Sequence, residues 1–375
     1  MLAPLWRLPR ILHGVTTIPR ALVIGTGFGG WFAGFERAVL AALRRAGVMT
    51  ARASTAILLD GLAARDGWDA PAPWDLVLVL GGERLDAATA RSLRRLGRVV
   101  AAWVTEDPYT IDRRPEAWAG AFDVVFTNER MAVDRYGPGR GVHLPWCTDP
   151  QTYRPERVGP PEELDVVFVG SGFPHRVRLL NAMADLLATL RVELVGPWDR
   201  WDVALDPRLR RFVRPPTGRP EAEARLYSRA AITLNVHRLP GPHDLPENLN
   251  ASHVGAVSPN NRTFDVAACG AFQLVDDTRA DLPRYFRPGE EIEVFRGPED
   301  LAAKLRHYLG RPQLRRAMAQ RARRRVLAEH TYDHRIRRML HIVASLGARG
   351  REGAEHADRL ELLHGPAGRA RAGPR

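Results

Sequence analysis

Residues 261–265 bring together a cation, free backbone amides and a carboxylate. In the run NNRTFDVAACG, Asn261 and Arg262 precede a short predicted helix, Asp265 lies on its first turn, and the strand AFQLV follows. In doubly wound sheets, ligands bind beside such turns, at the carboxyl ends of the strands. The amides of the first turn and Arg262 suit a phosphate, and the carboxylate of Asp265 suits a ribose diol. Alternatively, Asp265 complements the helix dipole and pairs with Arg262.

The run GTGFGG at residues 25–30 is a second candidate phosphate site. Gly25, Gly27 and Gly30 match the pattern GxGxxG between a predicted strand and a predicted helix, which is typical of dinucleotide-binding turns. In such folds an acidic residue about 20 positions later binds a ribose hydroxyl. The chain has no carboxylate there, although Arg52 leaves an NADP site open. The other interpretations are a loop that contacts another ligand and a glycine-rich turn without one.

Two acidic residues follow the predicted strand over 98–104. Glu106 and Asp107 are therefore candidates for the base that takes a proton from an attacking hydroxyl. A structural interpretation is equally open, in which they cap the next helix and pair with Arg113 or Arg114.

His237 and Asn235 lie at the end of the predicted strand over 231–236. Because they leave the sheet at its carboxyl edge, both side chains would face the same cleft. His237 is a candidate for a sugar or phosphate contact, and the alternative is a structural histidine.

No metal site is expected. Cys147 and Cys269 stand far apart without paired histidines, so neither a zinc site nor a disulfide framework is predicted, and a reducing cytoplasm is the expected location. No DxD motif lies at the end of a predicted strand. Asp276 and Asp277 are adjacent, and we interpret them as part of a turn.

The elements that position these residues alternate between short β-branched runs and longer amphipathic stretches, which is typical of α/β proteins. A domain is expected over 20–150, a proline-rich connector over 151–163, a second domain with terminal helices over 164–346, and a frayed tail over 347–375. The predicted strands span residues 21–25, 76–80, 98–104, 123–127, 142–145, 165–170, 192–196, 211–215, 231–236, 271–275 and 292–295.

The chain of 375 residues carries a net charge of +12, which raises the question of anionic partners. Twelve basic and four acidic residues give the segment 298–343 a net charge of +8. A solvated helical face is one interpretation, and a face that attracts phosphate or an anionic membrane surface is the other. No nucleic-acid module is found, so binding to nucleic acid is not expected.

Taken together, several runs resemble one group of enzymes. VGSGFPHR, LNVH, SPNNRTFDVAACGAFQLVDD and HTYDHRIRRML resemble the donor domain of GT-B fold glycosyltransferases. WVTEDPY and FDVVFTNE resemble the N-terminal half of the CgeB-like spore-maturation family, which is related to glycosyltransferase family 4. The resemblance implies two Rossmann-like domains facing across a cleft, C-terminal helices, and sugar transfer from a nucleotide diphosphate-sugar to an unidentified acceptor. It implies no cofactor beyond that donor.

The resemblance also suggests which residues bind the donor. Asp265 stands at the position of the family acid that holds the ribose, and a basic residue at the position of Arg176 neutralises the diphosphate. Gly29 and Gly30 match the glycine pair that lets the backbone approach the phosphates. The remaining donor-binding candidates are Ser171, Asn235, Asn261, Arg262 and Thr263.

One departure from the family 4 pattern bears on stereochemistry. That pattern has two glutamates separated by seven residues, whereas this chain has Val257 at the first position and Asp265 at the second. The resemblance therefore does not decide between retention and inversion. The competing hypotheses are a basic protein that binds nucleic acid or a membrane on a degenerate GT-B scaffold, and an NADP-dependent oxidoreductase.

Overall fold

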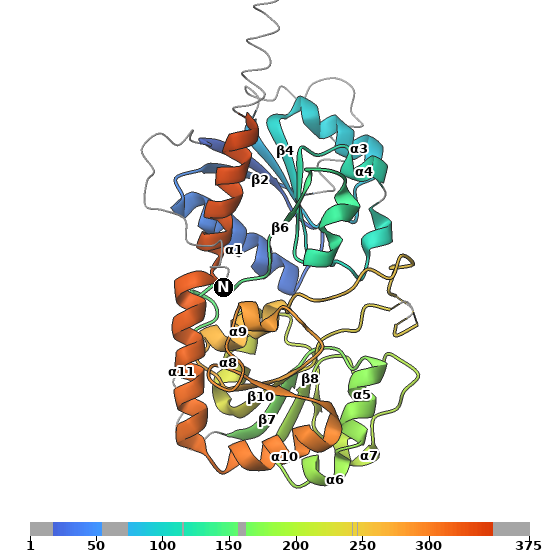
Figure 1. Cartoon of the computed structure of the whole chain (residues 1–375), viewed down its shortest axis with the longest axis vertical. Coiled ribbons are helices and arrows are strands. Elements are labelled where there is room, and N and C mark those ends of the chain that lie inside the picture. The colour runs from blue at the N-terminus through green and yellow to red at the C-terminus, as the bar shows by residue number, and fades with distance from the viewer. Residues whose placement is uncertain are drawn as a thin grey trace, which may run out of the picture.

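The computed structural model describes residues 18–54, 74–114, 116–156, 163–241, 243–245 and 247–347. These residues form two α/β domains, one above the other in Figure 1. Each domain contains a sheet of six strands, and every strand pair is parallel. The predicted doubly wound α/β class is confirmed.

The N-terminal sheet has the strand order β2-β1-β3-β4-β5-β6. Its strands are β1 (Arg20–Ile24), β2 (Met49–Ala53), β3 (Trp74–Leu80), β4 (Gly97–Val104), β5 (Val124–Thr127) and β6 (Gly141–His143). Its helices are α1 (Trp31–Arg45), α3 (Ala87–Ser92), α4 (Glu116–Ala119) and the 3₁₀ helices η1 (Leu93–Arg95), η2 (Ile111–Arg113) and η3 (Arg130–Tyr136). The central strands are buried almost throughout, as expected where helices cover both faces of a parallel sheet.

The C-terminal sheet has the strand order β12-β11-β10-β7-β8-β9. Its strands are β7 (Leu164–Val169), β8 (Val192–Val195), β9 (Val213–Arg214), β10 (Ala230–Asn235), β11 (Gln273–Asp276) and β12 (Glu293–Phe295). Its helices are α5 (Pro174–Asn181), α6 (Ala184–Leu187), α7 (Pro207–Arg210), α8 (Pro220–Arg229), α9 (Asn261–Ala268), η4 (Leu282–Arg284), α10 (Gly297–Leu309) and α11 (Pro312–Glu329). All eleven strands predicted from the sequence are present, with small shifts at their ends.

Each sheet has one point at which its strand order reverses. The reversal lies between β1 and β3 in the N-terminal sheet and between β7 and β10 in the C-terminal sheet. Loops that leave the carboxyl ends of such strand pairs line a crevice, where ligands of doubly wound sheets bind. The run GTGFGG follows β1, and the loops that contain Arg176 and His237 follow β7 and β10.

The chain crosses between the domains twice at one place. Thr148 on the outward crossing forms a β-bridge with Thr331 on the return. The helix over 332–347, red in Figure 1, then lies along the N-terminal domain. Tyr332 packs near Phe35 and Trp103, with ring centroids 6.0 and 6.1 Å apart. The prediction that placed all of 164–346 in the second domain is therefore wrong for this helix.

Candidate active site

Arg176 lies where the strand order of the C-terminal sheet reverses, between β7 and β10. Its guanidinium donates hydrogen bonds to the carbonyl of Ser171 after β7, at 2.9 Å, and to the carbonyl of Val236 after β10, at 2.5 Å. The same group lies over the ring of Phe173, 4.5 Å from its centroid. Arg176 is only 4% exposed, so its charge is held inside the crevice rather than in solvent.

Arg262 lies beside Arg176 without a carboxylate to separate them. A Cβ atom added to Gly170 would lie 2.7 Å from Nη2 of Arg262 and 3.4 Å from Nη1 of Arg176, so both guanidiniums flank one glycine. Among the described residues, neither arginine has an acidic partner within ion-pair distance. Burial and the nearby Arg262 charge lower the pKa of Arg176. Two cations held together in this way form a site for an anion.

Asn235 and Thr263 fix the start of α9 and with it Arg262. Asn235 is fully buried, donates to Oγ1 of Thr263 at 3.0 Å and accepts from Nη1 of Arg262 at 3.2 Å. Asn260 caps the helix by accepting from the amide of Thr263 at 3.0 Å. Since the amide and hydroxyl of Thr263 are both bound within the protein, Asn235 and Thr263 act on a ligand through the position of Arg262.

Asp265 joins α9 to the chain crossing. One of its carboxylate oxygens accepts from the hydroxyl of Thr148 at 2.8 Å, and the other accepts from the side-chain amide of Asn261 at 3.1 Å. Burial raises the pKa of Asp265. The interpretation in which Asp265 pairs with Arg262 is wrong, because Thr148 and Asn261 are its partners. Asp265 also lines a pocket of about 20 Å³ together with Trp31 of α1, so it lies where the two domains meet.

The backbone of Gly29 and Gly30, just before α1, is not covered by other parts of the protein. Both are exposed, and a Cβ atom added to either would meet no protein atom within 4 Å. Gly30 is the N-cap of α1 with φ of 62°, a conformation that favours glycine. The backbone at this turn is therefore free to approach a ligand closely.

Gly25, the first glycine of the run GTGFGG, packs against a carboxylate of its own domain. Glu36 of α1 accepts from the amide of Thr26 at 2.7 Å and pairs with Arg52 at 2.6 Å. A Cβ atom on Gly25 would lie 2.7 Å from this carboxylate, so the glycine is required by packing. Because Arg52 is already paired, the structure argues against its use for the 2′-phosphate of NADP.

Glu106 belongs to the N-terminal domain and contacts the C-terminal domain. Its carboxylate lies 3.6 Å from the guanidinium of Arg238, the residue after His237, and its side chain is 33% exposed. Arg238 in turn stacks on Tyr109, 4.5 Å from the ring centroid. Burial raises the pKa of Glu106 to about 7, although the Arg238 charge opposes the shift. A carboxylate with such a pKa accepts and releases a proton near neutrality.

Asp107 does not share this position. Its carboxylate is buried and accepts hydrogen bonds from Arg114, from the hydroxyl of Thr127 at 2.6 Å and from the hydroxyl of Tyr136 at 2.6 Å. Because the side chain is fully buried and three donors hold its two oxygens, the carboxylate is not accessible to an acceptor hydroxyl. The structure therefore corrects the prediction of Asp107 as a base and supports the alternative of pairing with Arg114.

His237 forms a pair with Asp276 at the carboxyl ends of β10 and β11. Asp276 accepts from the backbone amide of His237 at 2.5 Å and lies 2.7 Å from Nδ1 of its ring. Burial lowers the pKa of His237 to about 4, so the ring is neutral at pH 7. The carbonyl of His237 accepts from Nε2 of His175 at 2.8 Å, which ties the loops after β7 and β10 together again.

Comparison with known proteins agrees with this architecture. A family model described as glycosyl transferase-like matches residues 176–341. Spore protein CgeB of Bacillus subtilis (strain 168) is 27% identical over 265 residues, which cover 69% of this chain and 80% of that protein. The residues that the family model matches include Arg176, Arg262 and Asp265. The chain is thus similar to glycosyltransferases over this region.

Solved glycosyltransferases share the fold at low sequence identity. Sucrose-phosphate synthase of Thermosynechococcus elongatus has a TM-score of 0.62 and 15% identity, with 88% of this chain and 100% of that chain covered. An α-glucosyltransferase in complex with UDP has a TM-score of 0.60 and 10% identity, with coverage of 87% and 100%. HepE of Anabaena, in complex with UDP and glucose, has a TM-score of 0.57 and 10% identity, with coverage of 90% and 100%.

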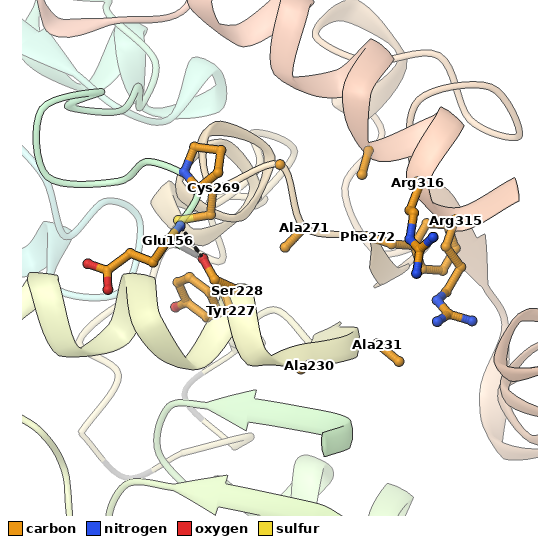
Figure 2. A pocket seen from close by; sticks show the side chains of 13 residues that line it. Glu156, Tyr227, Ser228, Ala230, Ala231, Cys269, Ala271, Phe272, Arg315 and Arg316 are labelled. Atoms are coloured by element: carbon orange, nitrogen blue, oxygen red, sulfur yellow. Dashed lines mark hydrogen bonds between the residues drawn. The ribbon is translucent and has the colours of Figure 1, made fainter. Parts of the chain in front are cut away.

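A further pocket lies away from the residues described above. It has a volume of about 170 Å³ and adjoins Ala230 and Ala271, near the amino ends of β10 and β11. Figure 2 shows Tyr227 and Ser228 on one side of it and Arg315 on the other. Because ligands of doubly wound sheets bind at the carboxyl ends of the strands, this pocket is not the candidate active site.

Several residues that shape the site were not predicted. Arg279 is buried after β11 and donates to the hydroxyl of Tyr109 at 3.0 Å across the domain boundary. Arg238, Tyr109 and Thr148 likewise act through contacts between segments far apart in the sequence. Their only sequence signal is their position just beyond a predicted strand. The hydroxyl of Ser171, by contrast, has no hydrogen-bond partner in the described part of the chain, and only its carbonyl contributes, through Arg176.

Proposed function

We propose that this chain is a glycosyltransferase, which transfers a sugar from a nucleotide diphosphate-sugar to a hydroxyl of a glycoconjugate or small-molecule acceptor. The observation that carries the proposal is the pair of guanidiniums at Arg176 and Arg262, which lack a carboxylate partner among the described residues. A diphosphate has the charge and the acceptor oxygens to match them. The UDP bound in two of the similar structures is consistent with this ligand class.

In the proposed reaction, each side chain of the site has a separate role. The acceptor oxygen forms a bond to the anomeric carbon, while the bond from that carbon to the diphosphate oxygen breaks. Arg176 and Arg262 stabilise the negative charge that develops on the leaving diphosphate. Glu106 takes the proton of the acceptor hydroxyl, and Asp265 accepts hydrogen bonds from the ribose diol.

The basic C-terminal segment does not favour a different function. Arg325 pairs with Glu291 at 3.0 Å, and Arg335 donates to the carbonyl of Pro145 at 2.8 Å, so part of the charge excess stabilises the fold. No helix in the described ranges is long and apolar enough to cross a membrane. Association with an anionic membrane remains a prediction for vesicle flotation with and without anionic lipid.

The test is the thermal shift of the protein with UDP, GDP, dTDP and ADP. We expect one diphosphate to raise the melting temperature, since a ligand at 100 times its Kd adds about 2.7 kcal/mol of stability. We expect the Arg262→Gln variant to bind that diphosphate at least tenfold more weakly than the wild type. Arg208→Gln is the matched control, because Arg208 is an exposed arginine of α7 in the same domain and pairs with Asp206, the N-cap of that helix. A flat response of the wild-type protein to all four nucleotides would contradict the proposal.

A further inference from the structure

Four buried polar atoms around His237 have no partner among the described residues. They are Nε2 of His237, Nδ1 of His175, Nε of Arg176 and Nε of Arg279. His237, Arg176 and Arg279 are 1%, 4% and 3% exposed, so solvent does not satisfy these atoms in the unliganded fold. They belong to side chains around one segment, because Arg176, His175 and Arg279 donate to the carbonyls of Val236, His237 and Arg238. Buried polar atoms without partners that gather in one part of a fold indicate a binding site.

The hydrogen bonds already made fix which of the four atoms donate. Asp276 accepts from Nδ1 of His237, so Nε2 of that ring carries the lone pair. The carbonyl of His237 accepts from Nε2 of His175, so Nδ1 of His175 also carries a lone pair. Both arginine Nε atoms carry hydrogens. The cluster therefore presents two acceptors and two donors.

This mixture matches hydroxyl groups and not phosphate. A hydroxyl donates one hydrogen bond and accepts others, so it can bind a histidine lone pair and an arginine N–H together. Phosphate oxygens only accept, and a neutral histidine lone pair would repel them.

The cluster also lies beside the residues that we propose bind the diphosphate and the acceptor hydroxyl. Arg176 belongs both to the cluster and to the guanidinium pair with Arg262. On the other side, His237 is followed by Arg238, which contacts Glu106. A sugar whose anomeric carbon is attached to the diphosphate and approached by a hydroxyl bound to Glu106 would occupy the space between them.

We propose that His237, oriented by Asp276, accepts a hydrogen bond from a hydroxyl of the donor sugar and so contributes to sugar specificity. The proposal rests on the proposed function, because it requires a nucleotide diphosphate-sugar in the cleft. His237 is then a specificity-determining residue, and Asp276 is a positioning residue.

The sharpest variant is His237→Asn. Its side-chain amide can still donate to Asp276 in place of Nδ1, but it has no atom in the position of Nε2. The probes are UDP and UDP-glucose, or the diphosphate preferred in the thermal-shift panel and its glucose conjugate, with affinities measured by calorimetry. We expect the affinity for the sugar conjugate to fall roughly 5- to 30-fold and that for the free diphosphate to change less than twofold.

Four deoxyfluoro-glucose conjugates, altered at positions 2, 3, 4 and 6, test the same contact in the wild-type protein. Fluorine cannot donate a hydrogen bond, so one of the four should bind more weakly to the wild type and equally well to His237→Asn. Equal losses for free diphosphate and conjugate would overturn the proposal and make His237 structural. Unchanged affinities in the variant would overturn it as well and indicate that water fills the cluster. A wild type that binds none of the nucleotides would instead overturn the proposed function, and this inference with it.

Discussion

Glu129 accepts a hydrogen bond from the backbone amide of Val257 at 3.1 Å. The same oxygen accepts from the amide of Ser258 at 3.0 Å, while the other accepts from Met131 at 3.0 Å. Val257 stands where the family 4 pattern has its first glutamate. A carboxylate therefore lies beside that position, but it belongs to the N-terminal domain and binds backbone amides. Its role here is to join the two domains.

We expect Glu129→Ala to destabilise the protein by about 3 kcal/mol, because it leaves three amides without their acceptor. Urea denaturation followed by circular dichroism measures the effect. Glu290→Ala is the control, since the carboxylate of Glu290 is exposed and makes only a surface ion pair with Arg287. Equal stability of both variants would show that the amides find water instead.

We expect Glu106→Gln to lower kcat by a factor of about 10²–10⁴ and to leave diphosphate affinity unchanged, as for the loss of a general base. In the wild type, kcat should rise with pH and reach half of its maximum near pH 7, where Glu106 loses its proton. A profile that is flat between pH 5 and 8 would remove Glu106 from the reaction.

The same raised pKa predicts an effect on stability with a definite sign. Folding favours the protonated carboxyl of Glu106, so this contribution is complete below the unfolded pKa of 4.5 and is lost as the pH rises through about 7. Glu106→Gln should therefore melt at a higher temperature than the wild type at pH 8 and at a similar temperature at pH 4. The difference should be modest, since 33% of the side chain is exposed to solvent.

Gly29→Ala and Gly25→Ala should separate ligand approach from packing. At Gly29 the new methyl group meets no protein atom within 4 Å, so we expect the free energy of unfolding to change by less than about 0.5 kcal/mol. If donor phosphates approach this turn, kcat/KM should fall about tenfold or more. At Gly25 the methyl group would lie 2.7 Å from Glu36, and we expect about 1–3 kcal/mol of destabilisation. An active and stable Gly29→Ala variant would place the phosphates elsewhere.

Asp107→Asn should act on the fold before it acts on catalysis. Removing one charge of the buried pair with Arg114 is expected to destabilise the protein by about 3–5 kcal/mol. The exposed Asp134→Asn is the control, and calorimetry of both variants at pH 7 gives the comparison. If Asp107→Asn keeps its melting temperature but loses turnover, the assignment of a structural role is contradicted.

The strands and the residues directly after them could be predicted from the sequence, because parallel strands are buried, apolar and short. Glu106 and His237 were found for that reason, and Arg262 was found from its place at the start of a predicted helix. What could not be predicted is which of two adjacent acids faces the cleft. Asp107 is buried by Thr127 and Tyr136, which lie 20 and 29 residues further along the chain. Likewise, nothing in the local sequence indicates that Arg52 meets Glu36 or that Asp265 meets Thr148, since both contacts depend on how helices and crossings pack.

The position of the helix over 332–347 affects the order in which the two domains can fold during synthesis. Ile336, Met339 and Val343 lie in the same buried cluster as Val23 and Phe35, so the first domain shares its core with a segment made more than 300 residues later. Domains made first usually fold first, while synthesis continues. Here the earlier domain must wait for the later one to emerge, with part of its apolar surface uncovered. During that interval we expect the uncovered apolar surface to be open to chaperones, and the two domains can meet only once both have been synthesised.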